Sequence, residues 1–157
     1  MVKMEKLEKL QRKRQYGLGR MLMVSRKDFV ERVARGMRER DEELPSASAT
    51  LLPFIEFQGT RSVEIARRMG VSKQAAAKAV KDLENYGLIM REPDETDARA
   101  FVIRFTPYGL SYMMKLHEAI DDVEADYAKL MGAGRIRAMR EGLSLICYND
   151  PSPDVDA

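Results

Sequence analysis

Apolar residues recur at intervals of three and four along most of this chain, which is the spacing of one face of an α-helix. The longest stripe lies in the second half, where the intervals are 3, 4, 3, 4 and 3 residues. Its members are Met113, Leu116, Ile120, Val123, Tyr127 and Leu130. Thr106 and Pro107 suit the N-cap and the first position of a helix. We therefore predict a long helix from Thr106-Pro107 to about residue 130, whose heptad-like stripe suits packing against another helix.

A second stripe predicts a last helix near the end of the chain. Its apolar members follow one another at intervals of 3, 4 and 3 residues: Ile136, Met139, Leu143 and Ile146. Gly132 and Gly134 separate it from the long helix. The tail 149–157 is rich in Pro and Asp, so we expect it to be disordered.

The first third of the chain predicts an arm and a helix. Residues 1–15 are basic, with Met4, Leu7 and Leu10 between the charged residues, and we expect an arm that is helical or frayed. The segment 16–19, Tyr-Gly-Leu-Gly, interrupts it. Apolar spacing then predicts a helix over about 20–40. A short helix over 47–57 should follow, irregular at Pro53.

Two short helices joined by a glycine turn are predicted in the middle of the chain. Thr60 or Ser62 is a candidate N-cap for the first, and Gly70 suits its left-handed end. Ser72 can cap the second, which should run to about Tyr86. The expected buried stripe of the second helix is Ala76, Ala79, Val80 and Leu83. Its opposite face carries small, basic and hydrogen-bonding side chains: Lys73, Gln74, Ala77, Lys78 and Lys81.

A β-hairpin is predicted directly after these helices. Residues 89–91 and 100–105 read as paired strands, because apolar and polar side chains alternate in the second. The charged loop between them holds Asp94, Asp97 and Arg99. A helix pair joined by a short turn can present its second helix to the DNA major groove. A hairpin with an arginine near its tip can reach phosphates or the minor groove beside it, so the order of elements argues for DNA binding.

We therefore predict an α+β fold that is mostly helical, a winged helix-turn-helix with N- and C-terminal dimerisation helices. The expected organisation is an arm over 1–17, one unit over 18–148 and the tail. Within the unit, the winged lobe covers 60–106. The dimerisation helices fall in 18–44 and 107–147.

Charge is unevenly distributed, although the net charge is only +2. Residues 1–40 hold 13 Lys and Arg against 5 Asp and Glu, a balance of +8. Residues 41–58 and 111–157 each carry −4, and residues 59–110 carry +2. A polyanion would meet a basic N-terminal third. The alternative, that these cations only solvate helix faces, stays open at this stage.

Few features point to other chemistry. One cysteine, Cys147, allows no intramolecular disulfide, and it is most often a small buried hydrophobe at such a position. The charged N-terminus and the absence of an apolar run of about 20 residues predict a cytoplasmic protein without a membrane partner. His117 is the only histidine and makes no zinc site with one cysteine. No catalytic or phosphate-binding motif is visible, so we expect no enzyme activity, metal or cofactor.

Several motifs make the chain similar to the MarR family of bacterial winged-helix regulators. They are residues 64–72, residues 80–89, Asp94 with 97–99, and residues 106–109. The Asp-x-Arg of the loop, followed by Thr-Pro-x-Gly seven residues beyond the arginine, is the most specific of them. The resemblance covers about 18–147 in element order and 62–109 in sequence.

The resemblance implies a dimeric regulator, usually a repressor, that binds a pseudo-palindromic operator and often responds to a small aromatic ligand. It places Arg99 at the wing tip, with Asp97 bracing it. It places these residues on the DNA side of the recognition helix: Ser72, Lys73, Gln74, Ala77 and Lys78. Lys81 shares that face. The family often has hydroxyl groups where Ala75 and Ala77 stand, so base reading should rely more on Gln74, the lysines and the wing.

The expected partners are double-stranded DNA and a second copy of the chain. The outer helices would form the dimer through Met113, Leu116, Ile120, Val123, Tyr127, Leu130, Ile136 and Leu143. A ligand would act between these helices and the DNA-binding lobe. The resemblance does not carry over a redox mechanism, because Cys147 lies at the other end of the chain from the family's sensing cysteine. The alternative is a ligand-independent DNA-binding or interaction module controlled by a partner protein.

Overall fold

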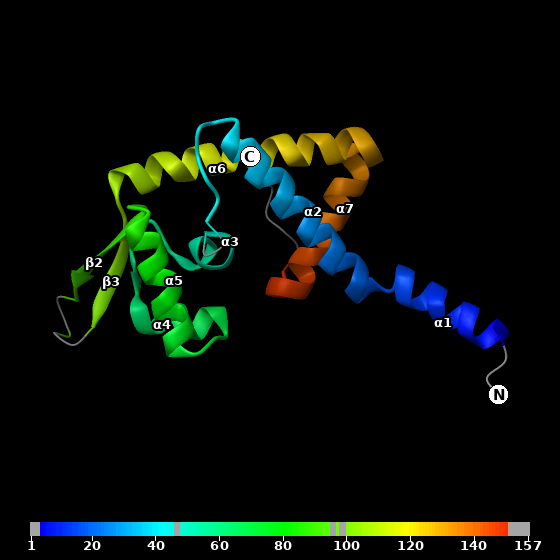
Figure 1. Ribbon diagram of the computed structural model, residues 1–157, viewed down its shortest axis with the longest axis horizontal. Coiled ribbons are helices and arrows are strands. Elements are labelled where there is room, and N and C mark those ends of the chain that lie inside the picture. The colour runs from blue at the N-terminus through cyan, green and yellow to red at the C-terminus, as the bar shows by residue number, and fades with distance from the viewer. Residues whose placement is uncertain (1–3, 46–47, 95–96, 98–99, 151–157) are drawn as a thin grey trace. The chain divides into compact units, whose positions relative to one another are not determined.

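A computed structural model describes residues 4–45, 48–94, 97 and 100–150 of the chain. The chain divides into two compact units, Met1–Leu116 and His117–Ala157. The elements appear in order in Figure 1: α1 (Met4–Tyr16), α2 (Leu18–Arg38), α3 (Ser48–Leu51), the 3₁₀ helix η1 (Leu52–Phe54), β1 (Thr60–Arg61), α4 (Ser62–Met69), α5 (Lys73–Asn85), β2 (Ile89–Pro93), β3 (Phe101–Phe105), α6 (Pro107–Met131) and α7 (Ala133–Tyr148). The predicted fold class, mostly helical with a small antiparallel sheet, is confirmed.

The N-terminal arm is a helix, α1, that ends at a glycine. Gly17 has extended backbone angles, φ −66° and ψ 138°, and stands between α1 and α2. A Cβ atom there would lie 2.7 Å from the carbonyl oxygen of Lys13, so the chain can bend at this point only with glycine. The predicted interruption is therefore real, and α2 begins at Leu18, two residues before the expected start.

The short helix predicted over 47–57 is two pieces. One turn of α-helix, α3, passes directly into the 3₁₀ helix η1, which contains Pro53. Proline lacks the N–H that would continue α3, so the chain tightens there and ends its helical path at Phe54. Leu51, Leu52 and Ile55 are buried and anchor this segment in the core.

The two middle helices form as predicted. Gly70 ends α4 in the left-handed conformation, with φ 63° and ψ 28°. Ser72 caps α5, because its Oγ accepts a hydrogen bond from the Ala75 N–H at 3.2 Å. The core between them includes Ile65 and Leu83, both fully buried.

The sheet has three strands in the order β1-β3-β2, all antiparallel. The hairpin was predicted, and its register pairs Ile89 with Phe105 and Pro93 with Phe101. Strand β1 was not predicted, because a two-residue strand has no periodicity to detect. It changes the role of Thr60, which pairs with Ile103 and is not an N-cap. The N-cap of α4 is Arg61, without a side-chain hydrogen bond.

A compact motif joins the hairpin to α6. Thr106 Oγ1 accepts a hydrogen bond from the Gly109 N–H at 2.9 Å and donates one to the Gly87 carbonyl at 2.5 Å. The Thr106 N–H donates to the Leu88 carbonyl at 3.1 Å. Gly109 lies directly against Leu88, the residue before β2, since a Cβ atom there would lie 1.9 Å from the Leu88 oxygen. The Thr-Pro-x-Gly motif therefore fixes the start of α6 to the start of β2.

The first turns of α6 are also tied to the segment after α2. Tyr112 is buried, and its hydroxyl donates to the Glu43 carbonyl at 2.9 Å. The Glu42 carboxylate accepts hydrogen bonds from Lys115 Nζ and Tyr108 Oη, both at 2.6 Å. These contacts, with Lys115 the larger, lower the pKa of Glu42, and the same carboxylate raises the pKa of Tyr108.

The second unit consists of the end of α6 and α7. Gly132, at φ 90°, makes the turn between the helices, and Arg140 on α7 pairs with Glu124 on α6. Asn149 caps α7 in the left-handed conformation, and Ser144 Oγ donates to the Asp150 carbonyl at 2.8 Å. Residues 149–150 of the expected disordered tail are thus ordered, and 151–157 lie outside the described residues.

Candidate nucleic-acid interface

The outer face of α5 is the candidate site. Every residue predicted to face DNA there is exposed: Ser72, Lys73, Gln74, Ala77, Lys78 and Lys81. The opposite face is buried through Ala76, Val80 and Leu83, whereas Ala79 of the expected buried stripe is half-buried. The helix therefore separates a packing face from a polar face, and Ser72 already uses its oxygen as the N-cap.

The lysines and arginines of the lobe differ in their partners. Among the described residues, no carboxylate pairs with Lys73, Lys78 or Lys81. The described arginines between residues 59 and 110 all pair with carboxylates, namely Arg61, Arg67, Arg68, Arg91 and Arg104. The lysines of α5 are thus available to an external anion, while the arginines stabilise the lobe itself.

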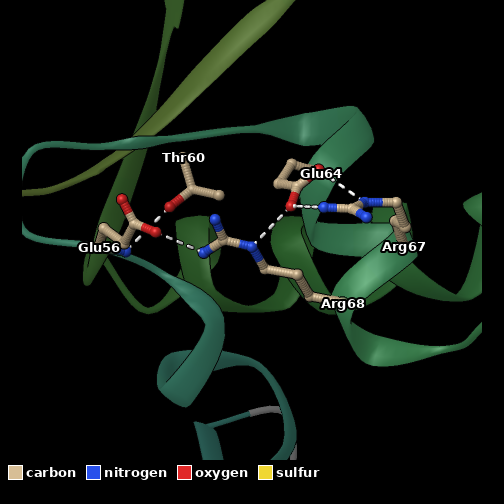
Figure 2. A network of polar contacts seen from close by, with 5 residues as sticks. All are labelled: Glu56, Thr60, Glu64, Arg67 and Arg68. Atoms are coloured by element: carbon tan, nitrogen blue, oxygen red, sulfur yellow. Dashed lines mark hydrogen bonds and ion pairs between the residues drawn. The ribbon is translucent and has the colours of Figure 1, made fainter.

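Figure 2 shows the densest of these ion-pair networks, centred on Glu64. Its carboxylate accepts hydrogen bonds from Arg67 and from Arg68, the latter at 2.8 Å. Arg68 also donates to Glu56 at 2.6 Å, and the Glu56 N–H donates to Thr60 Oγ1 at 2.9 Å. The arginines, Arg67 first, lower the pKa of Glu64 to about 2. The network therefore holds α4 against the segment before β1.

A second group of contacts fixes the base of the hairpin. Arg61 on β1 donates to Asp94 at 2.6 Å, and the Asp94 side chain is only 7% exposed. Asp94 Oδ1 also accepts the Asp97 N–H at 3.2 Å, which shapes the turn. Two backbone hydrogen bonds close the hairpin. The Asp94 N–H donates to the Ala100 carbonyl at 3.1 Å, and the Ala100 N–H donates to the Asp97 carbonyl at 2.8 Å. Asp94 is therefore the anchor of the wing.

The wing tip itself is only partly described. Asp97 is exposed and accepts the closing hydrogen bond through its backbone. Arg99 lies outside the described residues, so its insertion into the minor groove and its bracing by Asp97 stay predictions.

A cleft of about 200 Å³ lies beside α5. Val63 of α4, Ala77 and Val80 of α5, and Phe101 and Ile103 of β3 give it a largely apolar lining. Lys73 and Arg91 add two cationic groups, the second of which is paired with Glu84 at 2.7 Å. A small apolar group with an anionic substituent matches this lining.

Sequence reasoning missed the ion pairs that hold the lobe together. The contacts of Glu64 with Arg67 and Arg68 have the i,i+3 and i,i+4 spacing of helix pairs, so that signal was available. The Arg61–Asp94 pair joins residues 33 positions apart and left no local signal. The expectation for Cys147 was wrong, because this thiol is exposed near the end of α7.

Other site types find little support in the described part of the chain. No three His, Cys, Asp or Glu side chains there lie together as metal ligands, and His117 is exposed. None of the described helices combines the length and the apolar character that crossing a membrane requires.

The fold and this face of α5 are those of a winged helix-turn-helix protein, and known proteins are similar to the chain in sequence and in fold. Residues 43–100 match the MarR family model. A relative from Thauera aromatica, "Putative transcriptional regulatory protein for hcr operon", is 31% identical over 103 residues. The match covers 65% of this chain and 62% of that relative, so the chain spans less than two thirds of its length. Over residues 43–100 the chain is thus similar to the MarR family, as its motifs indicated.

Solved structures share the fold over most of the chain. CouR bound to a 23-mer DNA duplex has a TM-score of 0.71 at 20% identity, covering 94% of this chain and 99% of that one. CouR from Rhodococcus jostii RHA1 bound to p-coumaroyl-CoA has a TM-score of 0.66 at 20% identity, covering 88% and 97%. MarR from E. coli in its apo form gives 0.66 at 17% identity, covering 83% and 96%. At these identities the likeness establishes the fold.

Proposed function

We propose that this protein is a sequence-specific DNA-binding transcriptional regulator, a repressor that binds a pseudo-palindromic operator as a homodimer. One observation carries the proposal: on a winged helix-turn-helix fold, the face of α5 opposite its buried side exposes Gln74 and a row of lysines that no described carboxylate pairs with. Such a helix can enter a major groove, with lysines binding phosphate or guanine and glutamine reading adenine. The matched MarR family model and the similar solved structures are those of transcriptional regulators, which supports a regulator over an enzyme. A DNA partner is also consistent with the cytoplasmic location that we expect.

The test is selection of binding sites from a random duplex library with the wild-type protein and two variants. Gln74→Ala should relax the preference at one base pair, since a bidentate contact to adenine contributes about 1–3 kcal/mol of discrimination. If Lys78 contacts phosphate, Lys78→Ala should weaken binding to all duplexes alike, because a phosphate contact carries no sequence information. If wild-type protein enriches no sequence, the regulator is not sequence-specific. An unchanged sequence logo from Gln74→Ala would remove this residue from base reading.

A dimer is supported by the apolar side chains that a single chain leaves in solvent. Leu130 is 77% and Ile146 72% exposed, and both continue the predicted seams on α6 and α7. Leu116 and Val123, expected in the dimer seam, are buried within the single chain. The side chains open to a partner are therefore the outer members of the stripes.

We also propose a small aromatic acid as the effector. CouR has been solved with p-coumaroyl-CoA, but the cleft beside α5 has about 200 Å³, below the roughly 300–1,000 Å³ of typical ligand pockets. A single ring with a carboxylate suits its apolar lining and the cations Lys73 and Arg91. Benzoate should raise the melting temperature and release DNA. A site between the dimerisation helices and the lobe stays a prediction.

A further inference from the structure

The arm helix α1 carries a concentration of positive charge that the proposed function does not explain. None of its side chains is buried, and it holds five cations against two glutamates. The cations are Lys6, Lys9, Arg12, Lys13 and Arg14. A 13-residue helix without buried side chains gains little stability from packing, so its composition is not explained by the core.

These cations have no carboxylate partner in the part of the chain that the structure describes. Within the described residues, no carboxylate pairs with any cation of α1 or with Arg20 in the first turn of α2. The described arginines of the winged lobe do the opposite, since each is paired. Within the described residues, α1 with Arg20 and the face of α5 each gather several cations without a carboxylate partner. In its charge pattern the arm therefore resembles α5, the proposed DNA-reading helix, and differs from the arginines that form ion pairs within the winged lobe.

The spacing of the lysines suits a row of phosphates. Lys6, Lys9 and Lys13 are separated by three and four positions and lie on one face of α1. They span about 10 Å along the helix at about 1.5 Å per residue. One DNA strand presents a phosphate about every 3.4 Å of its axis. Three lysines on one face can therefore contact neighbouring phosphates.

A groove continues this surface at the bend of Gly17. It has a volume of about 290 Å³ and is lined by Gln11, Arg14, Gln15 and Arg20. All four side chains offer N–H donors, and none is a carboxylate. The two guanidinium groups can each hold a phosphate by paired hydrogen bonds.

The apolar positions of α1 favour nucleic acid over a lipid surface. Met4, Leu7 and Leu10 are exposed, but the same side of the helix continues with Gln11 and Arg14. Helices that lie on membranes need a continuous apolar face to bury. Here that face ends after two turns, whereas the cations continue to the end of the helix.

We propose that α1 and the first turn of α2 form a second DNA contact, which binds backbone phosphates without reading sequence. The inference rests on the proposed function and adds a partner surface to it. In this arrangement the basic arm increases the affinity for any DNA duplex, and α5 provides the preference for particular base pairs.

The experiment measures affinity against salt for two probes, a selected duplex and a 40-base-pair duplex of random sequence. Lys6, Lys9 and Lys13 are changed together to Gln, which keeps helix propensity but removes charge. A second variant carries Arg14→Gln and Arg20→Gln. The matched control removes three exposed cations elsewhere that also lack a carboxylate partner among the described residues: Arg26→Gln, Arg38→Gln and Arg137→Gln. A charge-preserving variant replaces the three arm lysines by Arg.

With both probes, the triple arm variant should flatten the slope of log K against log salt by about 2 to 3, because each phosphate contact contributes about 0.9. At 0.1 M salt this corresponds to affinity weaker on the order of 100-fold. The Arg14/Arg20 variant should flatten the slope by about 2. The arginine-for-lysine variant should bind like wild type, and circular dichroism should show the same helix content in all proteins.

Equal slopes for the triple arm variant and the matched control would overturn the arm contact. The arm contact would also be overturned if the triple arm variant kept the wild-type salt slopes for DNA but lost binding to phosphatidylserine vesicles. That result would make α1 a membrane-binding surface. The proposed function can fail separately. If selection enriches no sequence while the triple arm variant still loses affinity for the random duplex, the DNA contact of α1 is supported and sequence-specific regulation is not.

Discussion

At the scale of single residues, the lobe divides its charged side chains between two tasks. Arginines with carboxylate partners tie α4, the sheet and the wing base together, while the lysines of α5 are left for an external partner. Arginine suits the structural task because its planar group can bind two acceptors at once. Arg68 does so, with Glu64 at 2.8 Å and Glu56 at 2.6 Å.

Glu64 makes the stability of the lobe depend on pH in a defined window. Its pKa falls from 4.5 to about 2 in the folded protein, with the hydrogen bond from Arg67 the largest cause. A lowered folded pKa contributes stability that is complete above the unfolded pKa and is lost as pH falls toward 2. Glu64→Gln should therefore lower the melting temperature at pH 7, and this difference from wild type should shrink between pH 5 and 2.

Differential scanning calorimetry from pH 7 to 2 measures that difference. Glu141→Gln is the control, since Glu141 is exposed on α7 and has no ion-pair partner among the described residues. A deficit in Glu64→Gln that stays constant over the whole range would show that the Glu64 carboxylate does not act through its charge.

At the scale of elements, glycines decide where helices can approach other segments. Gly109 in α6 has no space for a side chain, because its Cβ would overlap the Leu88 carbonyl oxygen at 1.9 Å. Gly109→Ala should push α6 away from β2 and lower the free energy of unfolding by about 3 kcal/mol or more, the upper range for overpacking.

The matched control is Gly142→Ala in α7, where a Cβ would meet nothing within 4 Å. It should be neutral or stabilise the protein by up to about 1 kcal/mol, because alanine is the better helix former. Urea unfolding of both variants gives the comparison. If Gly109→Ala were as stable as wild type, α6 could move away from the start of β2 at little cost in free energy.

At the scale of the whole molecule, dimerisation is expected through apolar side chains left in solvent. Leu130→Asp combined with Ile146→Asp should yield a monomer while leaving the fold intact, because both side chains are more than two thirds exposed in the single chain. Asp in place of Val123 is less informative, since Val123 is buried and its loss would damage the core.

Light scattering at micromolar concentration measures the mass directly, with Lys129→Asp, at the exposed residue before Leu130 on α6, as a control. Loss of the dimer should also weaken operator binding, since two half-sites are then no longer held together. A wild-type mass of one chain would remove the dimer from the proposed function.

The sequence alone determined the elements with long periods and strong end signals. The stripe of α6, the Gly70 and Ser72 signals around the turn, and the alternation of β3 each encode a local choice that neighbouring residues enforce, and all appear in the structure. The exposed face of α5 was equally predictable, because a helix with one apolar stripe must present the rest.

Only the tertiary structure decided how those elements are joined. Strand β1, the Arg61–Asp94 anchor and the seat of Gly109 on Leu88 all depend on residues far apart in sequence that meet after folding. Such contacts leave no period in the chain, since their partners are chosen by the packing of whole elements. Burial followed the same rule: α6 reads as one continuous stripe, and folding placed Leu116 and Val123 in the core while leaving Leu130 in solvent.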